Sequence, residues 1–489
     1  MKREVVVAAA VTTAATLVGL AVFFRHWRRR SERRWRQVRR ILRNLAWCSA
    51  TTAAKLWDVA NELACDMEAG EKGGGNNIRL LVSYLAPLPT GDEKGTFYGI
   101  NLRGTNFLIL RARLQGKNEP VTELHKQEIA IPTAIMANAD STRELCDLIG
   151  LELSKFISQH SETDNEAQTR ERKLGFTVSY PINEDPASSG IASKWNRLSV
   201  DDTVGKELVA EINEAFKKHG VDMRVFAVVN DTVGDLAGGR YYSKETVAAV
   251  SLGMGTNVSY IESPEQVLNE PSNPAETVIN MEWGNFNSFN LPLTEYDTSL
   301  DAESLDPGNR IFEKLISGMY LGEIVRRVLL KMAQEAALFG DSVPPKLTIP
   351  YSLRSPDMAA MHQDTSEDYE VVEEKLKEIF DINDSTPMAR EIVTEICDIV
   401  AERGARLVGA GIVGIVKKMG RVENRKSVIT IEGGLYDHYR IFRNYLHSSV
   451  WEILGDEHSD NVIIEHSHGG SGAGSIFLAA SQTHKNAHS

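Results

Sequence analysis

The chain has 489 residues, enough for two or more domains with sizeable cores, and its 42% hydrophobic and 25% charged composition is ordinary for a globular protein. The net charge of −13 is unevenly distributed, because residues 25–43 hold ten arginines and one glutamate. The rest of the chain is therefore strongly acidic, which argues against nucleic-acid binding. Four cysteines without a CxxC pair argue against a zinc site or a disulfide framework and fit a reducing compartment.

The N-terminal stretch Val5–Phe24 contains no charged residue and is just long enough to span a bilayer as a helix. The arginine cluster after it, over residues 25–30, would hold the C-terminal side in the cytosol. We therefore expect a membrane anchor over residues 1–24. A cleaved signal or transit peptide is the alternative, although no small-residue cleavage site precedes the arginines and the run is not amphipathic. The basic arm, residues 25–43, either rests on anionic lipid or is a solvated helix face.

Two hairpins with hydrogen-bonding turns stand out further along the chain. Phe97–Leu102 and Phe107–Leu110 are predicted strands joined by the tight turn Arg103–Asn106. A similar turn, Ser251–Asn257, lies inside the alternating run Val247–Ile261. Consecutive backbone N–H groups in such turns can bind phosphate, although most hairpin turns bind nothing. The repeated pattern predicts two related halves that offer turns to a shared cleft.

Hydrophobic periodicity predicts the remaining elements. Helices are expected over Ser31–Met67, Arg143–Ile157, Val200–His219, Ile311–Phe339 and Ala389–Met419. Strands are expected over Leu174–Tyr180, Val225–Val229, Thr277–Phe286, Val428–Ile431 and Val462–Glu465. The polar segment Pro181–Ser193 is predicted to be a long loop, a length that is often functional.

Acidic residues follow two of these strands. Asp231 comes shortly after Val225–Val229, at the strand end where α/β folds place ligands. Equally, Asp231 could simply cap a helix that starts there. Glu432 follows Val428–Ile431 in the same way. The histidines near residue 468 are not expected to bind a metal, because no further ligand lies at suitable spacing.

Several of these segments together resemble the hexokinase family, in particular membrane-anchored plant hexokinases and their hexokinase-like relatives. The resemblance covers residues 35–480 approximately and rests on the segments KGTFYGINLRGTNF, LGFTVSYP, VVNDTVGDLAGGRYY, GMGTN, INMEWGNF, LDPGNRIFEKLISGMYLGEI and IEGGLYDHY. It implies an α/β actin-like ATPase (ribonuclease H-like) fold, with two domains around a sugar and ATP cleft. The expected large domain is 44–90 and 232–465, and the expected small domain is 91–231, to which 466–489 returns.

The resemblance also implies roles for individual residues. Asp231 matches the general base that takes the proton from the hexose 6-hydroxyl. The residues implied to bind the sugar, here called the sugar side, are Ser179, Asn196, Arg197, Asn230, Asp231, Asn257, Glu282 and Glu313. Those implied to bind ATP with Mg²⁺, here called the phosphate side, are Asn101, Arg103, Gly104, Thr105, Asn106, Gly253, Met254, Gly255, Thr256, Gly433 and Gly434. No side chain is predicted to bind a metal directly.

The phosphate side departs from the family pattern. Asn101 replaces an aspartate that helps to organise hydrated Mg²⁺, and Met254 replaces a phosphate-binding hydroxyl. The other replacements are Arg103 for glycine, Leu108 for arginine, and Glu432 and Gly469 for aspartates. On the sugar side, Arg197 replaces a lysine that steadies the transferring phosphoryl group. Phosphoryl transfer depends on positioning and electrostatic stabilisation, and one lost group commonly costs about a hundred- to a thousand-fold in rate.

We therefore expect a protein that binds hexose, phosphorylates it weakly or not at all, and acts in glucose sensing or regulation through protein partners. The resemblance implies that it is anchored to the mitochondrial outer membrane and faces the cytosol. One alternative is an active ATP-dependent hexokinase that makes hexose 6-phosphate for glycolysis, with Arg103 reaching the phosphates. Another alternative is an adaptor that binds no sugar and uses the fold only as a surface.

Overall fold

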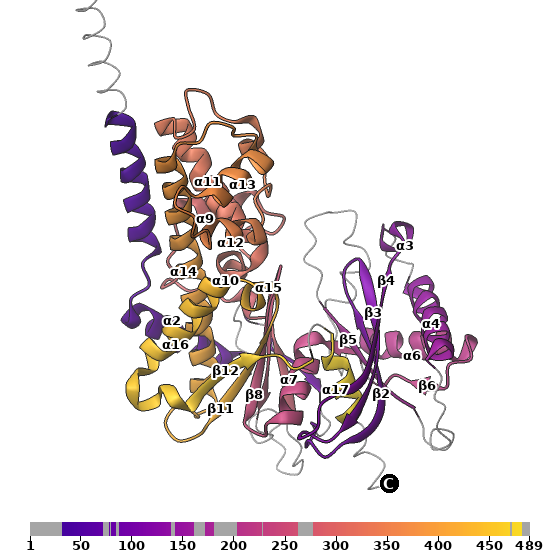
Figure 1. Cartoon of the computed structure of the whole chain (residues 1–489). Coiled ribbons are helices and arrows are strands. Elements are labelled where there is room, and N and C mark those ends of the chain that lie inside the picture. The colour runs from indigo at the N-terminus through magenta and orange to yellow at the C-terminus, as the bar shows by residue number, and fades with distance from the viewer. Residues whose placement is uncertain are drawn as a thin grey trace, which may run out of the picture. The chain divides into compact units, whose positions relative to one another are not determined.

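The computed structural model describes residues 32–71, 78, 80–84, 88–137, 142–160, 172–179, 203–226, 228–262, 277–469 and 472–481. The chain divides into two compact units, whose elements are labelled in Figure 1. Unit 1 comprises Met1–Ala50, Pro292–Thr298 and Gly322–Val400, and its described part is helical. Unit 2 comprises Thr51–Leu291, Ser299–Leu321 and Ala401–Ser489, and it contains both sheets. The predicted domain boundaries remain a prediction.

The first sheet of unit 2 is built on the first predicted hairpin, which is confirmed. Its strands follow the order β4 (Thr122–Ala130), β3 (Asn106–Gln115), β2 (Lys94–Leu102), β5 (Arg172–Val178) and β6 (Met223–Arg224), and β7 (Val228–Asn230) also pairs with β5. Strands β2 and β3 are antiparallel, with Leu102 opposite Phe107 at the turn. Strand β5 joins β2 in parallel, so the ends of β2, β5 and β7 meet at one edge of the sheet.

The second sheet repeats this plan with the second predicted hairpin, which is also confirmed. Its order is β1 (Leu80–Tyr84), β10 (Thr277–Met281), β9 (Thr256–Glu262), β8 (Thr246–Leu252), β11 (Ser427–Glu432) and β12 (Val462–His466). Strands β8 and β9 are antiparallel, whereas β11 is parallel to β8 and to β12. Each sheet therefore combines a hairpin with parallel strands whose carboxyl ends lie beside the hairpin turn.

Two helices of unit 2 contact strands at the site: α7 (Asp231–Tyr242) and α17 (Gly474–Ser481). Helix α17 packs on α7, β2 and β5 at very short range. A Cβ atom at Gly175 would lie 2.0 Å from the Ser475 carbonyl oxygen. Only glycine permits this approach, so the C-terminal helix is fixed against the strand that ends at Val178.

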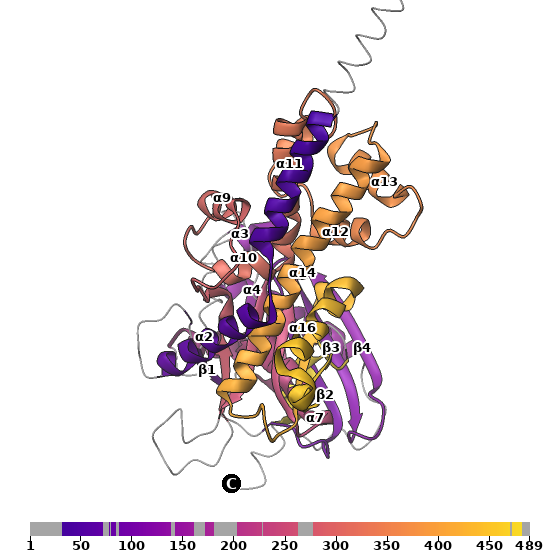
Figure 2. The ribbon, with the colours of Figure 1, turned by 90° about the vertical axis from the view of Figure 1, so that its left-hand side faces the viewer.

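The other helices are divided between the two units. In unit 2 they are α2 (Ala53–Glu71), α3 (Thr133–Ala137), α4 (Thr142–Gln159), α6 (Thr203–Lys218), η3 (Trp283–Asn285), α10 (Ile311–Ile316), α15 (Gly434–Asp437), α16 (Arg440–His458) and η5 (Ser459–Asn461). Unit 1 contains a helix over residues 32–49, η4 (Pro345–Thr348), α12 (Ser355–His362) and α13 (Glu370–Phe380). Three helices have residues in both units: α9 (Glu295–Glu303), α11 (Gly318–Ala336) and α14 (Pro387–Lys418). Figure 2 shows the helix over residues 32–49 on the outside of unit 1.

Two predicted long helices are wrong as single elements. The segment Ile311–Phe339 is interrupted at Ser317, which has an extended backbone between α10 and α11. The interruption lets the N–H groups of Gly318 and Met319 donate to the carbonyls of the 253–254 turn, at 2.9 and 3.0 Å. The segment Ser31–Met67 is likewise interrupted, at residues 50–52.

The predicted membrane anchor over residues 1–24 lies outside the described residues. Within the described part of the chain, no helix combines the length and apolar character needed to cross a membrane.

Candidate functional site

The centre of the site is the junction where strand β7 ends and helix α7 begins. Asn230 is the N-cap residue, and its Oδ1 atom accepts hydrogen bonds from the Thr232 N–H (3.0 Å) and hydroxyl (2.6 Å). Asp231 is the first helical residue, and its Oδ1 atom accepts a hydrogen bond from the same N–H (2.8 Å). A strand therefore ends here and a helix starts at Asp231, but Asn230 and not Asp231 is the N-cap; ligand binding at Asp231 stays a prediction.

Asp231 has the acid–base character that a general base needs. Desolvation raises the pKa of its carboxyl to about 7, and the nearby charge of Glu432 acts in the same direction. A hydrogen bond from Ser179 and the charge of Arg103 oppose this rise. A carboxylate with a pKa near neutrality can accept a proton from a hydroxyl group at working pH.

Three asparagines next to this junction form a connected network of amides. The Asn257 Nδ2 atom donates to Asn230 Oδ1 (2.8 Å) and to Asn280 Oδ1 (2.7 Å). The three residues come from β9, β7 and β10, and each is at most 7% exposed. Buried amides fixed by mutual hydrogen bonds give a rigid wall of donors and acceptors. Sequence analysis predicted Asn230 and Asn257 but missed Asn280, whose only signal is an amide inside the apolar segment VINM.

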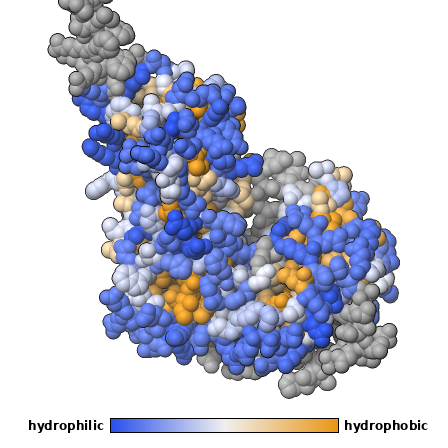
Figure 3. Space-filling view, viewed as in Figure 1, coloured by the Kyte–Doolittle hydropathy of each residue, from blue (hydrophilic) through white to orange (hydrophobic). Residues whose placement is uncertain are grey.

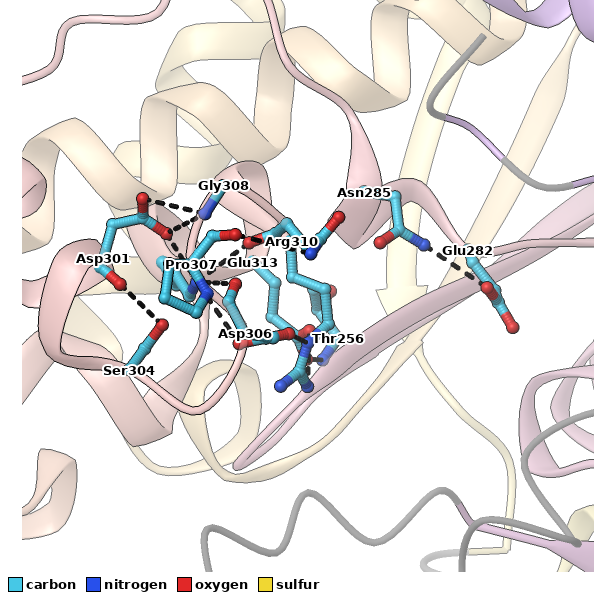
Figure 4. Close-up of polar contacts among 12 residues, drawn as sticks. Thr256, Glu282, Asn285, Asp301, Ser304, Asp306, Pro307, Gly308, Arg310 and Glu313 are labelled. Carbon is cyan, nitrogen blue, oxygen red and sulfur yellow. Dashed lines mark hydrogen bonds and ion pairs between the residues drawn. The ribbon is translucent and has the colours of Figure 1, made fainter. Parts of the chain in front are cut away.

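Glu313 lies in a second polar cluster, drawn in Figure 4. It is 5% exposed, and its Oε1 atom accepts a hydrogen bond from the Thr256 N–H (3.3 Å). Arg310 bridges it to Asp306, with 3.4 Å between Arg310 Nη1 and Glu313 Oε2. Burial raises the pKa of Glu313, and the Arg310 charge opposes that rise. The hairpin turn, helix α10 and the 306–310 loop are therefore joined at this carboxylate.

Glu282 is placed at the end of β10, between strand and 3₁₀ helix. Its Oε2 atom accepts a hydrogen bond from Asn285 (3.3 Å), and Figure 4 shows it to one side of the Arg310 cluster. The next residue, Trp283, is fully buried and donates its indole N–H to Thr256 Oγ1 (2.9 Å). Because Trp283 is buried and hydrogen-bonded, the position of the Glu282 backbone before it is fixed.

On the phosphate side, the replaced residues of the first turn bind each other. The Arg103 Nε atom donates to Asn101 Oδ1 (2.9 Å), while the Asn101 amide nitrogen donates to the hydroxyls of Thr177 (3.0 Å) and Ser179 (3.4 Å). Asn101 is 1% exposed. Both functional ends of the Asn101 side chain are therefore engaged within the protein, and Arg103 is held beside Asp231, whose pKa it lowers.

The rest of that turn is held by the neighbouring strand. The Arg103 N–H donates to the Asn106 carbonyl (2.8 Å), and the Ile131 N–H donates to the Thr105 carbonyl (2.9 Å). The Asn106 amide donates to Glu128 of β4 (2.5 Å). Thr105 is exposed, and Gly104 lies between these anchored positions.

Leu108 is a core residue and not part of the turn's lining. It is fully buried, and a Cβ atom at Gly472 would approach its Cδ1 atom to 3.0 Å. Sequence analysis interpreted Leu108 as the replacement of an arginine on the phosphate side. In the structure, however, its side chain packs with apolar neighbours, so an arginine could not simply be restored there.

The hairpin turn Ser251–Asn257 and the glycine pair Gly433–Gly434 lie against each other. A Cβ atom at Gly433 would lie 2.4 Å from the Leu252 carbonyl oxygen and 2.8 Å from the Gly253 nitrogen, and Gly433 has a φ of 118°. The turn itself closes with a hydrogen bond from the Gly253 N–H to the Gly255 carbonyl (3.0 Å), and Gly434 begins helix α15. The Met254 side chain is 53% exposed and offers no hydroxyl.

Asp235 is a residue of the site that sequence analysis missed. It lies one helical turn after Asp231 on α7, is 3% exposed, and accepts a hydrogen bond from the Ser467 hydroxyl (3.2 Å). Burial and the charges of Glu432 and Asp231 raise its pKa well above the usual aspartate range. The available signal was the DTVGD spacing, since residues four apart share one face of a helix.

The described residues of the phosphate side suit a triphosphate poorly. Asp231, Asp235 and Glu432 bring three carboxyl groups close to the glycine turns, while Arg103 is bound to Asn101. Among the described residues, no group of three or more histidine, cysteine, aspartate or glutamate side chains is arranged to hold a metal ion. Two predicted sugar contacts, Asn196 and Arg197, lie outside the described residues. The remaining sugar-side residues flank the Asn230–Asp231 junction or line the adjoining hairpin turn of the second sheet.

Comparisons with known proteins identify relatives of this chain over almost its whole length. Two family models, both described as hexokinase, match residues 41–241 and 247–481. Hexokinase-1 of Spinacia oleracea is 48% identical over 99% of this chain and 98% of its own, and Hexokinase-1 of Arabidopsis thaliana is 46% identical over 98% of each. A hexokinase from Schistosoma mansoni complexed with glucose is 26% identical, with a TM-score of 0.75, over 92% of this chain and 99% of its own.

Proposed function

The chain belongs to the plant hexokinase family, and from that premise we propose that it binds a hexose, with glucose as the first candidate, and transfers phosphoryl groups to it only weakly. The observation that carries this proposal is the contrast within one site. The amide network at Asn230 is intact, whereas Arg103 is bound to Asn101 where a phosphate loop is expected.

Glucose binding is supported by the chemistry of the sugar side. Hexose hydroxyls both donate and accept hydrogen bonds, so a fitting pocket offers carboxylates and amides in fixed positions. Asn257, Glu282 and Glu313 provide these groups, and Asp231 would accept the proton of the reacting hydroxyl. A relative of similar fold is complexed with glucose, which favours the same ligand class for this chain.

Weak transfer is supported by the electrostatics of the phosphate side. In an active site of this kind, positive charges and backbone N–H groups must meet the triphosphate. Here the Glu432 carboxylate lies close to the glycine turns and to Asp235, and Met254 cannot donate a hydrogen bond. Mg²⁺ bound with ATP would neutralise part of the triphosphate charge, but the described residues hold no preformed metal site.

Calorimetry on the purified full chain tests both halves of the proposal separately. Glucose should bind with a dissociation constant in the micromolar to millimolar range, while MgATP added at saturating glucose should give little heat. Glu432→Gln should strengthen MgATP binding and leave glucose binding unchanged, because it removes a negative charge beside Gly433 and is not one of the sugar-side residues. Tight MgATP binding to the wild-type chain would contradict the weak-transfer half, and absence of glucose binding would favour the adaptor.

An active hexokinase is the second candidate, and one observation favours it. The Asp231 carboxyl, with a pKa of about 7, is suited to proton transfer, and Arg103 places a positive charge close to it. If Arg103 released Asn101 and contacted the γ-phosphate instead, it could replace some of the missing phosphate contacts. Arg103→Gly distinguishes the candidates: it should abolish turnover if Arg103 compensates, and should leave a low rate unchanged or raised if it does not.

We further propose that the protein is anchored to a membrane, by residues 1–24, and faces the cytosol, with the mitochondrial outer membrane as the first candidate. The uncharged run Val5–Phe24 and the arginines after it support this orientation. A weakly catalytic hexose-binding protein in that position would serve in glucose sensing with a protein partner. A fluorescent fusion to residues 1–43 should label a membrane organelle and resist carbonate washing. Diffuse cytosolic signal would contradict the anchor.

A further inference from the structure

The helix over residues 32–49 has one face fixed against unit 1. Val38, Ile41 and Leu45 are each at most 5% exposed and follow one another at helical spacing. On the same side, Arg34 forms an ion pair with Asp341, and Gln37 donates a hydrogen bond to Glu335 (3.0 Å). These contacts fix the rotation of the helix about its own axis, and they therefore decide which residues face outward.

The outward face consists of arginines and one tryptophan. At 100° per residue, Arg36, Arg40, Arg43 and Trp47 fall within a sector of about 60° opposite the buried residues. All four are exposed, and Trp47 is 83% exposed. Figure 3 shows that the visible surface over the helices labelled α11, α12 and α13 in Figure 1 is mostly hydrophilic.

These arginines are not used in ion pairs within the described structure. Arg36 donates to the Glu32 backbone carbonyl (3.2 Å), and no salt bridge to a described carboxylate involves Arg36, Arg40 or Arg43. Arg39, at the edge of this face, lies near Glu395 and partly offsets the burial that raises the pKa of that carboxyl. The positive charge of the face is thus available to an external partner, although the chain as a whole is acidic.

We propose that this face, defined by Arg36, Arg40, Arg43 and Trp47, rests on an anionic lipid surface. Arginines are attracted to anionic headgroups, and tryptophan prefers the interface between headgroups and acyl chains. The helix is about 27 Å long and presents the face along most of that length. Phe24, the end of the uncharged run, precedes Arg33 by only nine residues, which span about 30 Å at most. The face would lie within reach of any bilayer that holds that run.

The proposal is separate from hexose binding and phosphoryl transfer, and vesicle flotation of the full chain tests it. The vesicles are phosphatidylcholine alone or phosphatidylcholine with about 30% phosphatidylserine. Each basic residue near an anionic surface strengthens binding about fivefold. The triple variant Arg36→Gln, Arg40→Gln, Arg43→Gln should therefore bind the anionic vesicles about a hundredfold more weakly than wild type. Binding to neutral vesicles should be the same for both proteins.

A matched control removes three charges from other exposed positions of unit 1: Lys346→Gln, Arg354→Gln, Lys377→Gln. This control should retain the wild-type preference for anionic vesicles within about threefold. An equal loss in both triple variants would show that net charge alone matters and would overturn the proposal. Unchanged binding of the Arg36, Arg40, Arg43 variant would also overturn it.

Trp47 gives a second, independent test. Trp47→Ala should weaken binding to the anionic vesicles several-fold at constant charge, whereas Trp451→Ala, which removes a tryptophan 58% exposed on α16, should not. Equal effects of the two variants would contradict a specific face. If soluble polyglutamate captures the wild-type chain while the anionic vesicles do not, the occupant is an acidic protein and the lipid proposal fails.

Discussion

The sugar side and the phosphate side of the site come from the same two sheets, but their polar groups are used differently. On the sugar side, Asn257 joins Asn230 to Asn280 and so preorganises amides around the Asp231 junction. On the phosphate side, Arg103 and Asn101 satisfy each other across the first turn. In both halves buried amides are fixed by protein partners, but only on the phosphate side does this pairing also engage a cationic group, Arg103.

We propose that this difference would let a site of this kind lose phosphoryl transfer and keep hexose binding. Most described residues of the predicted sugar side lie at strand ends, so we expect them to keep their positions without the phosphate contacts. The phosphate contacts depend on turn residues, where replacement changes charge without disturbing the strands. Loss of transfer with retained hexose binding is consequently the expected outcome of the replacements on this chain.

The largest expected effect comes from restoring the phosphate side. We expect the combined variant Asn101→Asp, Arg103→Gly, Arg197→Lys and Met254→Thr to raise turnover of hexose by about a hundredfold or more, because each group removed from such a site commonly costs that much. Asn101→Asp alone should recover little, since the contacts act together. A coupled glucose 6-phosphate assay measures both. If the combined variant shows no higher turnover, the replaced residues are not what limits phosphoryl transfer.

The next largest effect concerns stability. Leu108→Arg, which restores the family residue, should lower the free energy of unfolding by about 4 kcal/mol, because it buries an unpaired charge in the core. Leu108→Met, the matched control, keeps the volume and should cost less than about 1.5 kcal/mol. Urea unfolding compares them. An arginine tolerated at this position would mean that Leu108 lines the phosphate side after all.

The amide network predicts a smaller effect on binding. Asn257→Ala should weaken glucose binding by at least about tenfold, because Asn230 and Asn280 each lose a hydrogen-bond donor. Asn383→Ala, an exposed asparagine in unit 1, is the control and should leave the affinity unchanged. Thermal protection by glucose reads out both variants. If glucose protects Asn257→Ala against heat as well as it protects the wild type, the amide network does not take part in glucose binding.

The last effect is the pH dependence of stability due to Asp231. Its carboxyl has a pKa of about 7 in the folded chain and 3.8 as the ordinary value, so the folded state binds more protons between those values. Wild-type stability should therefore fall as pH rises from about 4 to 7, by at most about 4 kcal/mol through this group. Asp231→Asn should remove that part of the decrease. Parallel stability curves for the two proteins would contradict the raised pKa.

Sequence analysis predicted the two hairpins and the strand-end acids well, because both follow from local pattern. Turn residues between alternating apolar runs led directly to β2–β3 and β8–β9, and the apolar run before Asn230 led to Asp231. The break at Ser317 was not predictable, since it depends on the turn carbonyls of residues 253–254, which come from elsewhere in the chain. The proximity of Asp235 to Glu432 is a tertiary fact of the same kind, whereas the hydrogen bond from Arg103 to Asn101 joins residues only two apart and depends on the side-chain conformations at the end of β2.

The most direct measurement uses one preparation of the full chain, with Asp231→Ala alongside it. Saturating glucose should raise the thermal midpoint of the wild-type chain, because a ligand that binds only the folded state stabilises it. In a coupled glucose 6-phosphate assay, the same preparation should turn over at least about a thousandfold below a typical hexokinase, a deficit of about 4 kcal/mol in transition-state stabilisation. Ordinary turnover that Asp231→Ala abolishes would contradict the separation of the two sides and identify an active enzyme.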